Sequence, residues 1–190
     1  MQDREADGEA GRLRAEAVAM LSEQAALWSA PLATVRRRAT VIGRGGLATL
    51  TEEDDPYDGR TGPDRPVRAV GEFLYEPDGA VIRARLVTAV AAGVQGGLLD
   101  AHIAYVTSDM GFRSPFARAY RVVEELPYRE KQLKAALRAR DIGVLSIKKR
   151  GVAIDPASLR RRLALSGANS ATLVLTRRAG SGVALLVEPL

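Results

Sequence analysis

The sequence contains no cysteine, a single histidine and no long hydrophobic run. The lack of cysteine excludes disulfides, thiolate nucleophiles and cysteine-type zinc sites, and one histidine leaves no pair of imidazoles for a metal centre. No stretch approaches the roughly 18 to 20 apolar residues that a membrane-spanning helix needs, and the opening residues lack the apolar centre of a signal peptide. These absences predict a cytoplasmic protein with no metal site and no membrane partner.

Aromatic residues are also few, at 5% of the chain. Beyond residue 110 they are Phe112, Phe116, Tyr120 and Tyr128. Proteins that read single-stranded RNA stack bases on several exposed aromatic rings. Any nucleic-acid contact by this half is therefore expected to rely on shape and on the phosphate backbone.

Charge is distributed unevenly along the 190 residues. Residues 1–110 hold 12 Lys/Arg against 17 Asp/Glu, a net of −5, whereas residues 111–190 hold 16 against 6, a net of +10. Clustered cations favour a polyanionic partner, because phosphate neutralisation releases counterions. The alternative explanation is an arginine excess that comes from a GC-rich genome and serves only solvation.

Composition divides the chain into three parts. Residues 1–24 are charged and then alanine-rich, which predicts a flexible tail or helix. Residues 25–110 are expected to form a connecting α/β region. A stretch containing Gly111 and ending at Pro115 marks the boundary of a second unit, residues 111–190, and coincides with the change in charge sign.

The sequence at the beginning of the connecting region predicts a β-hairpin. Residues 38–42 and 47–51 are strand-like and are joined by a glycine-rich turn. A phosphate-binding loop is the alternative, but such a loop requires a following helix, and the next run has a β pattern. The acidic, proline-rich residues 52–66 predict a solvated loop rather than a metal site.

A β-α-β unit is expected next. It comprises a strand at 72–75, a helix capped by Asp78 that runs to about Val94, and a strand at 101–107. His102 falls on this last strand. We interpret it as a hydrogen-bonded structural residue, because no serine, cysteine or acid pair is spaced to form a triad with it.

The second half predicts the order β-α-β-α-β-β. The expected elements are a strand at 119–125, a helix at 128–140, a strand at 143–147, a helix at 155–165 ended by Gly167, and strands at 171–176 and 182–187. Alternating strands and short amphipathic helices favour a small mixed sheet with helices packed on a face. The fold class predicted for the chain is therefore α+β.

Basic residues of the second half form three clusters. They are Lys131, Lys134 and Arg138 with Arg140 on the first helix; Lys148, Lys149 and Arg150 after the middle strand; and Arg160 and Arg161 with Arg162 on the second helix. For either helix alone, a solvated helix face is the favoured explanation of the cluster. The strand-end triplet is the best candidate for phosphate contact, because it precedes a helix N-terminus.

Several motifs resemble one known family. They are SPFARAYRVVEELPY at 114–128, IKKRG at 147–151, LALSG at 163–167 and ATLVLTR at 171–177, with ALWS at 26–29, RRAT at 37–40 and YEPDGAVIRA at 75–84 further upstream. Together these resemble the THUMP-like domain and preceding connecting region of bacterial class I S-adenosylmethionine-dependent methyltransferase-like proteins. The resemblance covers roughly residues 25 to 190.

The resemblance implies an RNA-directed role by analogy with the THUMP domains of RNA-modifying enzymes. Full-length members carry a Rossmann-type domain for S-adenosylmethionine, with a glycine-rich loop and a catalytic Asp-Pro strand end, and neither has a counterpart here. No catalytic, cofactor-binding or metal residue can therefore be carried over. The resemblance suggests an accessory half that binds structured RNA, such as transfer or ribosomal RNA, for a separate methyltransferase subunit.

Two alternatives remain open. The chain could be a truncated methyltransferase whose activity needs the missing Rossmann half, or one that completes its cofactor site by dimerising. It could also be a remnant that folds and binds nothing. Binding of S-adenosylmethionine would favour the first alternative, and behaviour on RNA that is insensitive to salt would favour the second.

Overall fold

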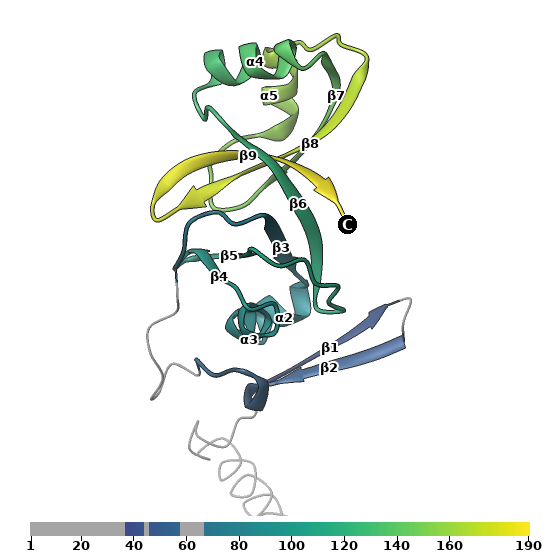
Figure 1. Cartoon of the computed structure of the whole chain (residues 1–190), viewed down its shortest axis with the longest axis vertical. Helices are drawn as coiled ribbons and strands as arrows, with labels where there is room; N and C mark the ends of the chain where they lie inside the picture. The colour runs from purple at the N-terminus through teal and green to yellow at the C-terminus, as the bar shows by residue number, and fades with distance from the viewer. Residues whose placement is uncertain (1–36, 44–45, 58–66) are drawn as a thin grey trace, which may run out of the picture. The chain divides into compact units, whose positions relative to one another are not determined.

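The computed structural model describes residues 37–43, 46–57 and 67–190 (Figure 1). The predicted tail at 1–24, the beginning of the connecting region and part of the predicted acidic loop lie outside these residues. Among the described helices, none is both long and apolar enough to span a membrane. The described residues belong to one compact unit, Arg37–Leu190.

Strands and helices follow one another as a mixed α+β chain, as predicted. In order, the elements are β1 (Arg38–Gly43), β2 (Gly46–Thr51), the 3-10 turn η2 (Glu52–Asp54), β3 (Phe73–Pro77), α2 (Gly79–Arg83), α3 (Val87–Gly93), β4 (Gly97–Asp100), β5 (Ile103–Ser108), β6 (Ala117–Leu126), α4 (Glu130–Ala139), β7 (Ile142–Lys149), α5 (Pro156–Leu163), β8 (Asn169–Arg178) and β9 (Ser181–Pro189). β1 and β2 form their own sheet, and the others form a mixed sheet in the order β4-β5-β3-β6-β9-β8-β7.

The predicted hairpin is confirmed by the antiparallel pairing of β1 and β2, in which Gly43 lies opposite Gly46. Gly46 has a φ of +98°, a backbone conformation that favours glycine. β2 is followed by η2 and not by an α-helix, so the turn lacks the context that a phosphate-binding loop needs.

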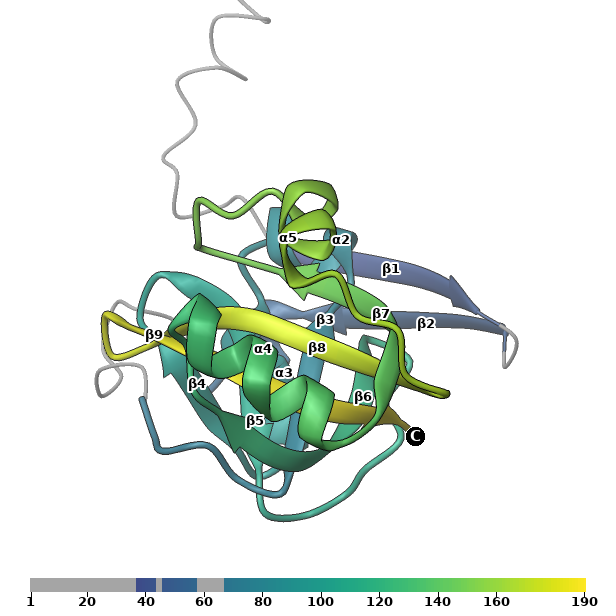
Figure 2. The same ribbon diagram turned by 90° about the horizontal axis from the view of Figure 1, so that it is seen from above.

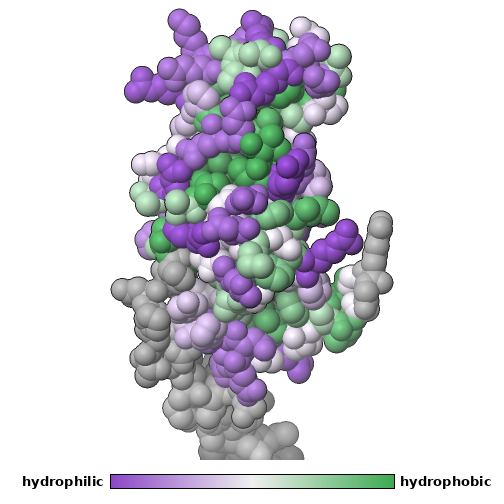
Figure 3. Space-filling model, viewed as in Figure 1, coloured by the Kyte–Doolittle hydropathy of each residue, from purple (hydrophilic) through white to green (hydrophobic). Residues whose placement is uncertain are grey.

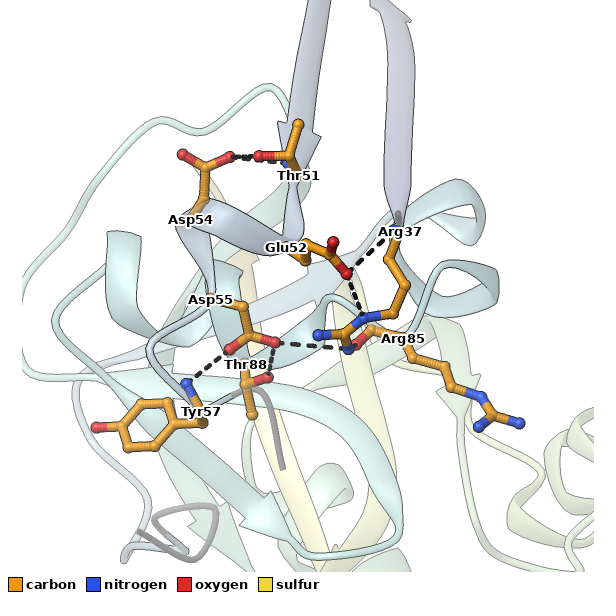
Figure 4. A network of polar contacts seen from close by, with 8 residues as sticks. All are labelled: Arg37, Thr51, Glu52, Asp54, Asp55, Tyr57, Arg85 and Thr88. Atoms are coloured by element: carbon orange, nitrogen blue, oxygen red, sulfur yellow. Dashed lines mark hydrogen bonds and ion pairs between the residues drawn. The ribbon is translucent and has the colours of Figure 1, made fainter. Parts of the chain in front are cut away.

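The acidic run after the hairpin contacts α3 (Figure 4). The Asp55 side chain is buried, accepts a hydrogen bond from Thr88 Oγ1 at 2.7 Å and lies 3.9 Å from Arg37 Nη1, while the Glu52 carboxylate lies 3.5 Å from Arg37 Nε. Arg37 also donates to the carbonyl of Arg85 at 3.0 Å. The prediction of a solvated acidic run is therefore wrong for Asp55, because Thr88 and Arg37 stabilise its carboxylate within the fold.

The predicted helix from Asp78 to Val94 is divided in two. Asp78 is the N-cap, as predicted, and its carboxylate accepts the backbone N–H of Ala80 at 2.8 Å. The helix stops because Arg85 adopts a φ of +58°, and α3 begins at Val87. This left-handed residue turns the chain so that both short helices bury apolar side chains against the hairpin and β3–β6.

β4 was not expected, because its four residues overlap the glycines that were assigned to the helix end. β4 and β5 pair as antiparallel strands. His102 lies in the turn between them, so its predicted place on a strand is wrong. Its side chain is exposed, and its backbone N–H donates to Asp100 Oδ1 at 3.0 Å.

The order β-α-β-α-β-β of the second half is confirmed by β6, α4, β7, α5, β8 and β9. Asp155 caps α5 by accepting the backbone N–H of Ser158, and Pro156 occupies the first turn. The helix ends at Ala164, which has a φ of +43°, and not at Gly167 as predicted. Gly167 instead lies against the backbone of Asp141, where a Cβ would collide with the Asp141 carbonyl.

Each face of strands β8 and β9 belongs to a different hydrophobic core. α4 and α5 pack on one face through Leu133, Leu137, Leu159 and Leu163, and α4 crosses β8 in Figure 2. The other face, with Val174 and Leu185, packs against Leu74 of β3 and Tyr105 of β5. The sheet therefore curls enough to bring β8 to β3 and β5 across this second core.

The sheet is continuous across the predicted boundary at residue 110. β3 pairs with β6 from Phe73↔Arg121 to Pro77↔Ala117. The turn between β8 and β9 also contacts β4, since the N–H of Ala179 donates to the Leu99 carbonyl at 3.1 Å. The division at residue 110 stays a prediction, but the strands on either side share one sheet and one core.

Candidate nucleic-acid interface

The basic residues of α4 have different surroundings. Lys134 Nζ donates to the carbonyl of Arg162 at 2.8 Å, and Arg138 donates to the carbonyl of Ala164 at 3.2 Å. Both carbonyls lie at the C-terminal end of α5, where cations complement the helix dipole. Lys131 is exposed, with no ion pair among the described residues. Two of the three predicted cations on this helix thus stabilise α5.

The arginines of α5 are exposed and spread around the helix. Arg162 forms an ion pair with Glu130 of α4 at 2.9 Å. Arg161 donates to Ser158 Oγ at 2.9 Å, and Arg160 has no ion pair within the described chain. Figure 3 shows hydrophilic residues interspersed with apolar ones at the end of the molecule that holds α4 and α5. These arginines remain accessible to solvent, with Arg162 already neutralised.

The side chains of the triplet at the end of β7, which is Lys148, Lys149 and Arg150, do not all lie on the same side of the strand. Successive side chains of an extended chain point to opposite sides, so Lys148 and Arg150 share a side and Lys149 does not. Lys148 Nζ lies 5.5 Å from the centre of the Tyr120 ring, and the Arg150 guanidinium lies 5.4 Å from that of Tyr105. Lys149 is exposed. The three predicted residues therefore do not form a single cationic surface.

Lys148 forms an ion pair with Glu76 of β3. Lys148 Nζ lies 2.8 Å from Glu76 Oε2, which also accepts the Tyr120 hydroxyl at 3.1 Å. Burial tends to raise the pKa of Glu76, but the hydrogen bond and charge of Lys148, helped by Tyr120, hold this pKa below its usual value. Glu76 is therefore ionised at neutral pH, and it neutralises Lys148.

A polar hollow of about 550 Å³ lies beside this ion pair. Its walls come from the end of β3, the start of α2, the start of β6 and the end of β7; the lining residues are Glu76, Pro77, Asp78, Gly79, Pro115, Ala117, Arg118, Lys148 and Arg150. The cations of the hollow are thus Lys148 and Arg150, which were predicted as site residues, and Arg118, which was not.

Arg118 and Glu76 could not be assigned to the site from sequence. They lie opposite one another in the pairing of β3 with β6. Arg118 is exposed. The Tyr120 hydroxyl raises the pKa of Arg118. Alternation along β6 places Arg118 on the same side of the strand as Tyr120, which was the only sequence signal for Arg118. The sequence did not show that β3, which carries Glu76, is the neighbouring strand.

Tyr105 lies under Arg150 and has an unpartnered hydroxyl. Its side chain is fully buried, and its oxygen has no hydrogen-bond partner among the described residues. Burial, together with the charge of Glu76, strongly raises the pKa of Tyr105, so the hydroxyl keeps its proton. Buried polar groups in folded proteins nearly always have partners, which makes this donor exceptional.

The described residues contain no cluster of metal ligands and one pair of parallel neighbouring strands. No group of three or more histidine or acidic side chains converges within the part of the chain that the structure describes. Nucleotide-type cofactors in open α/β proteins bind at the carboxyl ends of parallel strands, before a helix N-terminus. In this sheet only β7 and β8 are parallel neighbouring strands within the described ranges, and the Asp155 carboxylate occupies the N-terminus of the helix between them.

Comparisons with known proteins agree with this architecture. Residues 117–189 match the model of the THUMP domain-like family. Two Mycobacterium tuberculosis proteins, from strains CDC 1551 / Oshkosh and ATCC 25618 / H37Rv, are each 41% identical over 158 residues; both are named uncharacterized S-adenosylmethionine-dependent methyltransferases. The match covers 81% of this chain and 40% of each relative.

A solved structure shares the fold. It is a crystal structure from Porphyromonas gingivalis W83 of a protein provisionally named a methyltransferase, with a TM-score of 0.60, 24% identity and coverage of 75% of this chain and 34% of that chain. The chain thus spans less than half the length of the proteins that it matches. Residues 117–189 form a THUMP-like domain, and the chain is homologous to proteins named S-adenosylmethionine-dependent methyltransferases.

Proposed function

We propose that this chain binds structured RNA, such as transfer or ribosomal RNA, as the accessory part of an S-adenosylmethionine-dependent methyltransferase-type protein. The observation that carries the proposal is the convergence of Arg118, Lys148 and Arg150, from two separate strands, on one polar hollow. Lys149 adds an exposed cation at the same strand end. Phosphate oxygens are the ligands that such a group of cations favours.

The ion pairs of the domain decide which cations can contribute most. Arg140, Arg162 and Arg178 are neutralised by Glu124, Glu130 and Glu125. Cations that form no ion pair among the described residues include Arg118, Lys149 and Arg150 near the hollow, with Lys131, Arg160 and Arg161 on the two helices. A cation without a carboxylate partner gains more from a phosphate, because no existing pair must be broken. We therefore assign the main RNA contact to the hollow, with Lys149 as a separate contact on the other side of the same strand end.

The relatives' names support the second part of the proposal. A cofactor-binding methyltransferase domain would be supplied by a separate subunit, and this chain would present RNA to it. The second candidate is a truncated methyltransferase whose activity needs the Rossmann half, and the 40% coverage of the relatives favours it equally. Binding of S-adenosylmethionine to this chain by itself would support the second candidate.

The test is a salt titration of binding to bulk transfer RNA. The variant Arg118→Ala/Lys149→Ala removes two exposed cations without breaking the Glu76–Lys148 pair. Each lost phosphate contact flattens the slope of log K against log[salt] by about one, so we expect a slope shallower by up to about two. The affinity of the variant for transfer RNA at low salt should also be lower than that of the wild type.

The control is Arg38→Ala/Arg129→Ala, which removes two exposed cations that do not line the hollow and form no ion pair among the described residues. Its slope should match that of the wild type. Equal flattening by both variants would indicate a diffuse charge effect and contradict the assignment to the hollow. A wild-type protein whose RNA binding is absent or insensitive to salt would contradict the function itself.

A further inference from the structure

The hollow beside β7 has a local excess of positive charge. Of its charged groups, Lys148 and Glu76 neutralise one another at 2.8 Å. Asp78 is occupied by the backbone N–H of Ala80 as the cap of α2. The two guanidinium groups, Arg118 and Arg150, are in no ion pair among the described residues and lie on walls supplied by different strands. An anion in the hollow would therefore meet two planar, multidentate donors.

The size of the hollow limits what it can hold. Its volume of about 550 Å³ lies in the range of small-molecule sites, roughly 300 to 1,000 Å³. That volume accommodates a phosphate group together with part of a nucleotide. It is too small to enclose a nucleic-acid helix.

Tyr105 supplies an independent indication of a ligand. Its hydroxyl is a buried donor without an acceptor, and it is surrounded by Glu76, Tyr120 and Arg150, whose charges and hydroxyl act on its pKa. Arg150 both lines the hollow and covers the Tyr105 ring. Movement of this one flexible side chain toward a bound anion would give the anion access to the tyrosine hydroxyl.

We propose that the hollow is a binding site for a single phosphate group, held by the guanidinium groups of Arg118 and Arg150 and by the Tyr105 hydroxyl. This inference rests on the proposed function, because the phosphate group that binds in the hollow would belong to RNA. A free nucleotide offers the same chemistry. The site would thus bind one phosphate group in a defined pocket. This is more specific than a general electrostatic attraction between the basic surface and the RNA backbone.

The experiment is a calorimetric titration of the full chain with inorganic phosphate, comparing wild type with Tyr105→Phe. Tyr105→Phe removes only the hydroxyl, and in the free protein it deletes an unpartnered group, so folding should be unaffected or improved. If the hydroxyl donates to phosphate, the affinity falls by about tenfold, the usual effect of one hydrogen bond to a charged group. Arg118→Ala should weaken phosphate binding at least as much.

Tyr75→Phe is the matched control. The Tyr75 hydroxyl is also buried, but it donates to the Met110 carbonyl at 2.7 Å and accepts the N–H of Phe112 at 2.8 Å, within a different core. This variant should lower the melting temperature and leave phosphate affinity unchanged. Absence of phosphate binding by the wild type, or equal affinity in wild type and Tyr105→Phe, would overturn the proposal.

Two further titrations identify the source. If transfer RNA competes with inorganic phosphate, the phosphate belongs to RNA. If adenosine 5′-monophosphate competes and transfer RNA does not, a free nucleotide is the ligand, and the phosphate site stands without the RNA function. A wild-type protein that keeps its salt-dependent RNA binding but does not bind phosphate would retain the proposed function and lose this inference.

Discussion

Asp100 Oδ2 accepts the backbone N–H of Gly180 at 2.9 Å, which ties the turn after β4 to the turn between β8 and β9. The other carboxylate oxygen accepts the N–H of His102 at 3.0 Å. The side chain is buried although it is charged. Asp100 therefore links the end of β4 to the turn between β8 and β9, although β4 pairs with neither of these strands in the sheet.

Asp100→Ala should destabilise the protein by about 1–3 kcal/mol, because two backbone N–H groups lose their acceptor. Chemical denaturation at pH 7 measures this difference. Hydrogen bonds from His102 and Gly180 lower the pKa of Asp100 from 3.8. The stabilisation is therefore complete above the unfolded pKa and is lost as the pH falls through the lower, folded pKa.

The same series of measurements extended to acid pH tests that assignment. The difference between wild type and Asp100→Ala should shrink below about pH 4. A difference that stays constant down to pH 2 would mean that the carboxylate charge does not contribute.

Lys148 and Lys149 are adjacent, yet their substitution should have different effects on folding. Lys148→Met leaves the half-buried Glu76 without its ion-pair partner and should lower stability by about 1 kcal/mol or more. Lys149→Met changes an exposed side chain and should stay within about 0.5 kcal/mol of wild type. Urea denaturation of both variants measures the contrast, and similar losses would contradict the alternation of the two side chains at the end of β7.

Lys134 and Arg138 should stabilise α5 more than they bind RNA. Replacing either by alanine removes a hydrogen bond to the carbonyl of Arg162 or Ala164 and should cost about 0.5–1.5 kcal/mol. Amide hydrogen exchange should become faster in the last turn of α5. Lys131→Ala is the control on the same helix, and it should leave exchange in α5 unchanged.

The Asp55–Thr88 hydrogen bond should hold the hairpin region to α3. Thr88→Val keeps the side-chain shape but leaves a buried carboxylate short of one donor, which should cost about 1–3 kcal/mol. Hydrogen exchange in β1 and β2 should increase while exchange in β8 changes little. Equal acceleration in β8 would show that the whole unit opens at once. Thr40→Val on the exposed side of the hairpin is the comparison, with an expected change within about 0.5 kcal/mol.

The amino-acid sequence determined the local structure of the second half, because the signals there are themselves local. Asp155 and Pro156 begin a helix through their own backbone chemistry, and apolar spacing of three and four residues places Leu133 and Leu137 on one face. The same holds for Asp78 and for the hairpin at Gly43 and Gly46. Charge content likewise marked the basic half without any knowledge of the fold.

Tertiary structure decided the details that depend on distant partners. The break at Arg85 accompanies a hydrogen bond from Arg37, 48 residues earlier, and no local pattern marks it. β4 has only four residues, too few to show a period, and its pairing with β5 makes it a strand.

The candidate site also combines features that the sequence shows with features that only the tertiary structure decides. Lys148, Lys149 and Arg150 were predicted from the sequence, and alternation separates Lys149 from Lys148, whereas Arg118 was not predicted. Glu76 and Lys148, however, are 72 residues apart, and Tyr105 contacts Arg150 only because the curled sheet brings β5 to the end of β7. A sequence specifies side-chain chemistry and local periodicity, whereas the partners of a charge follow from strand order and sheet curvature, which many residues set together.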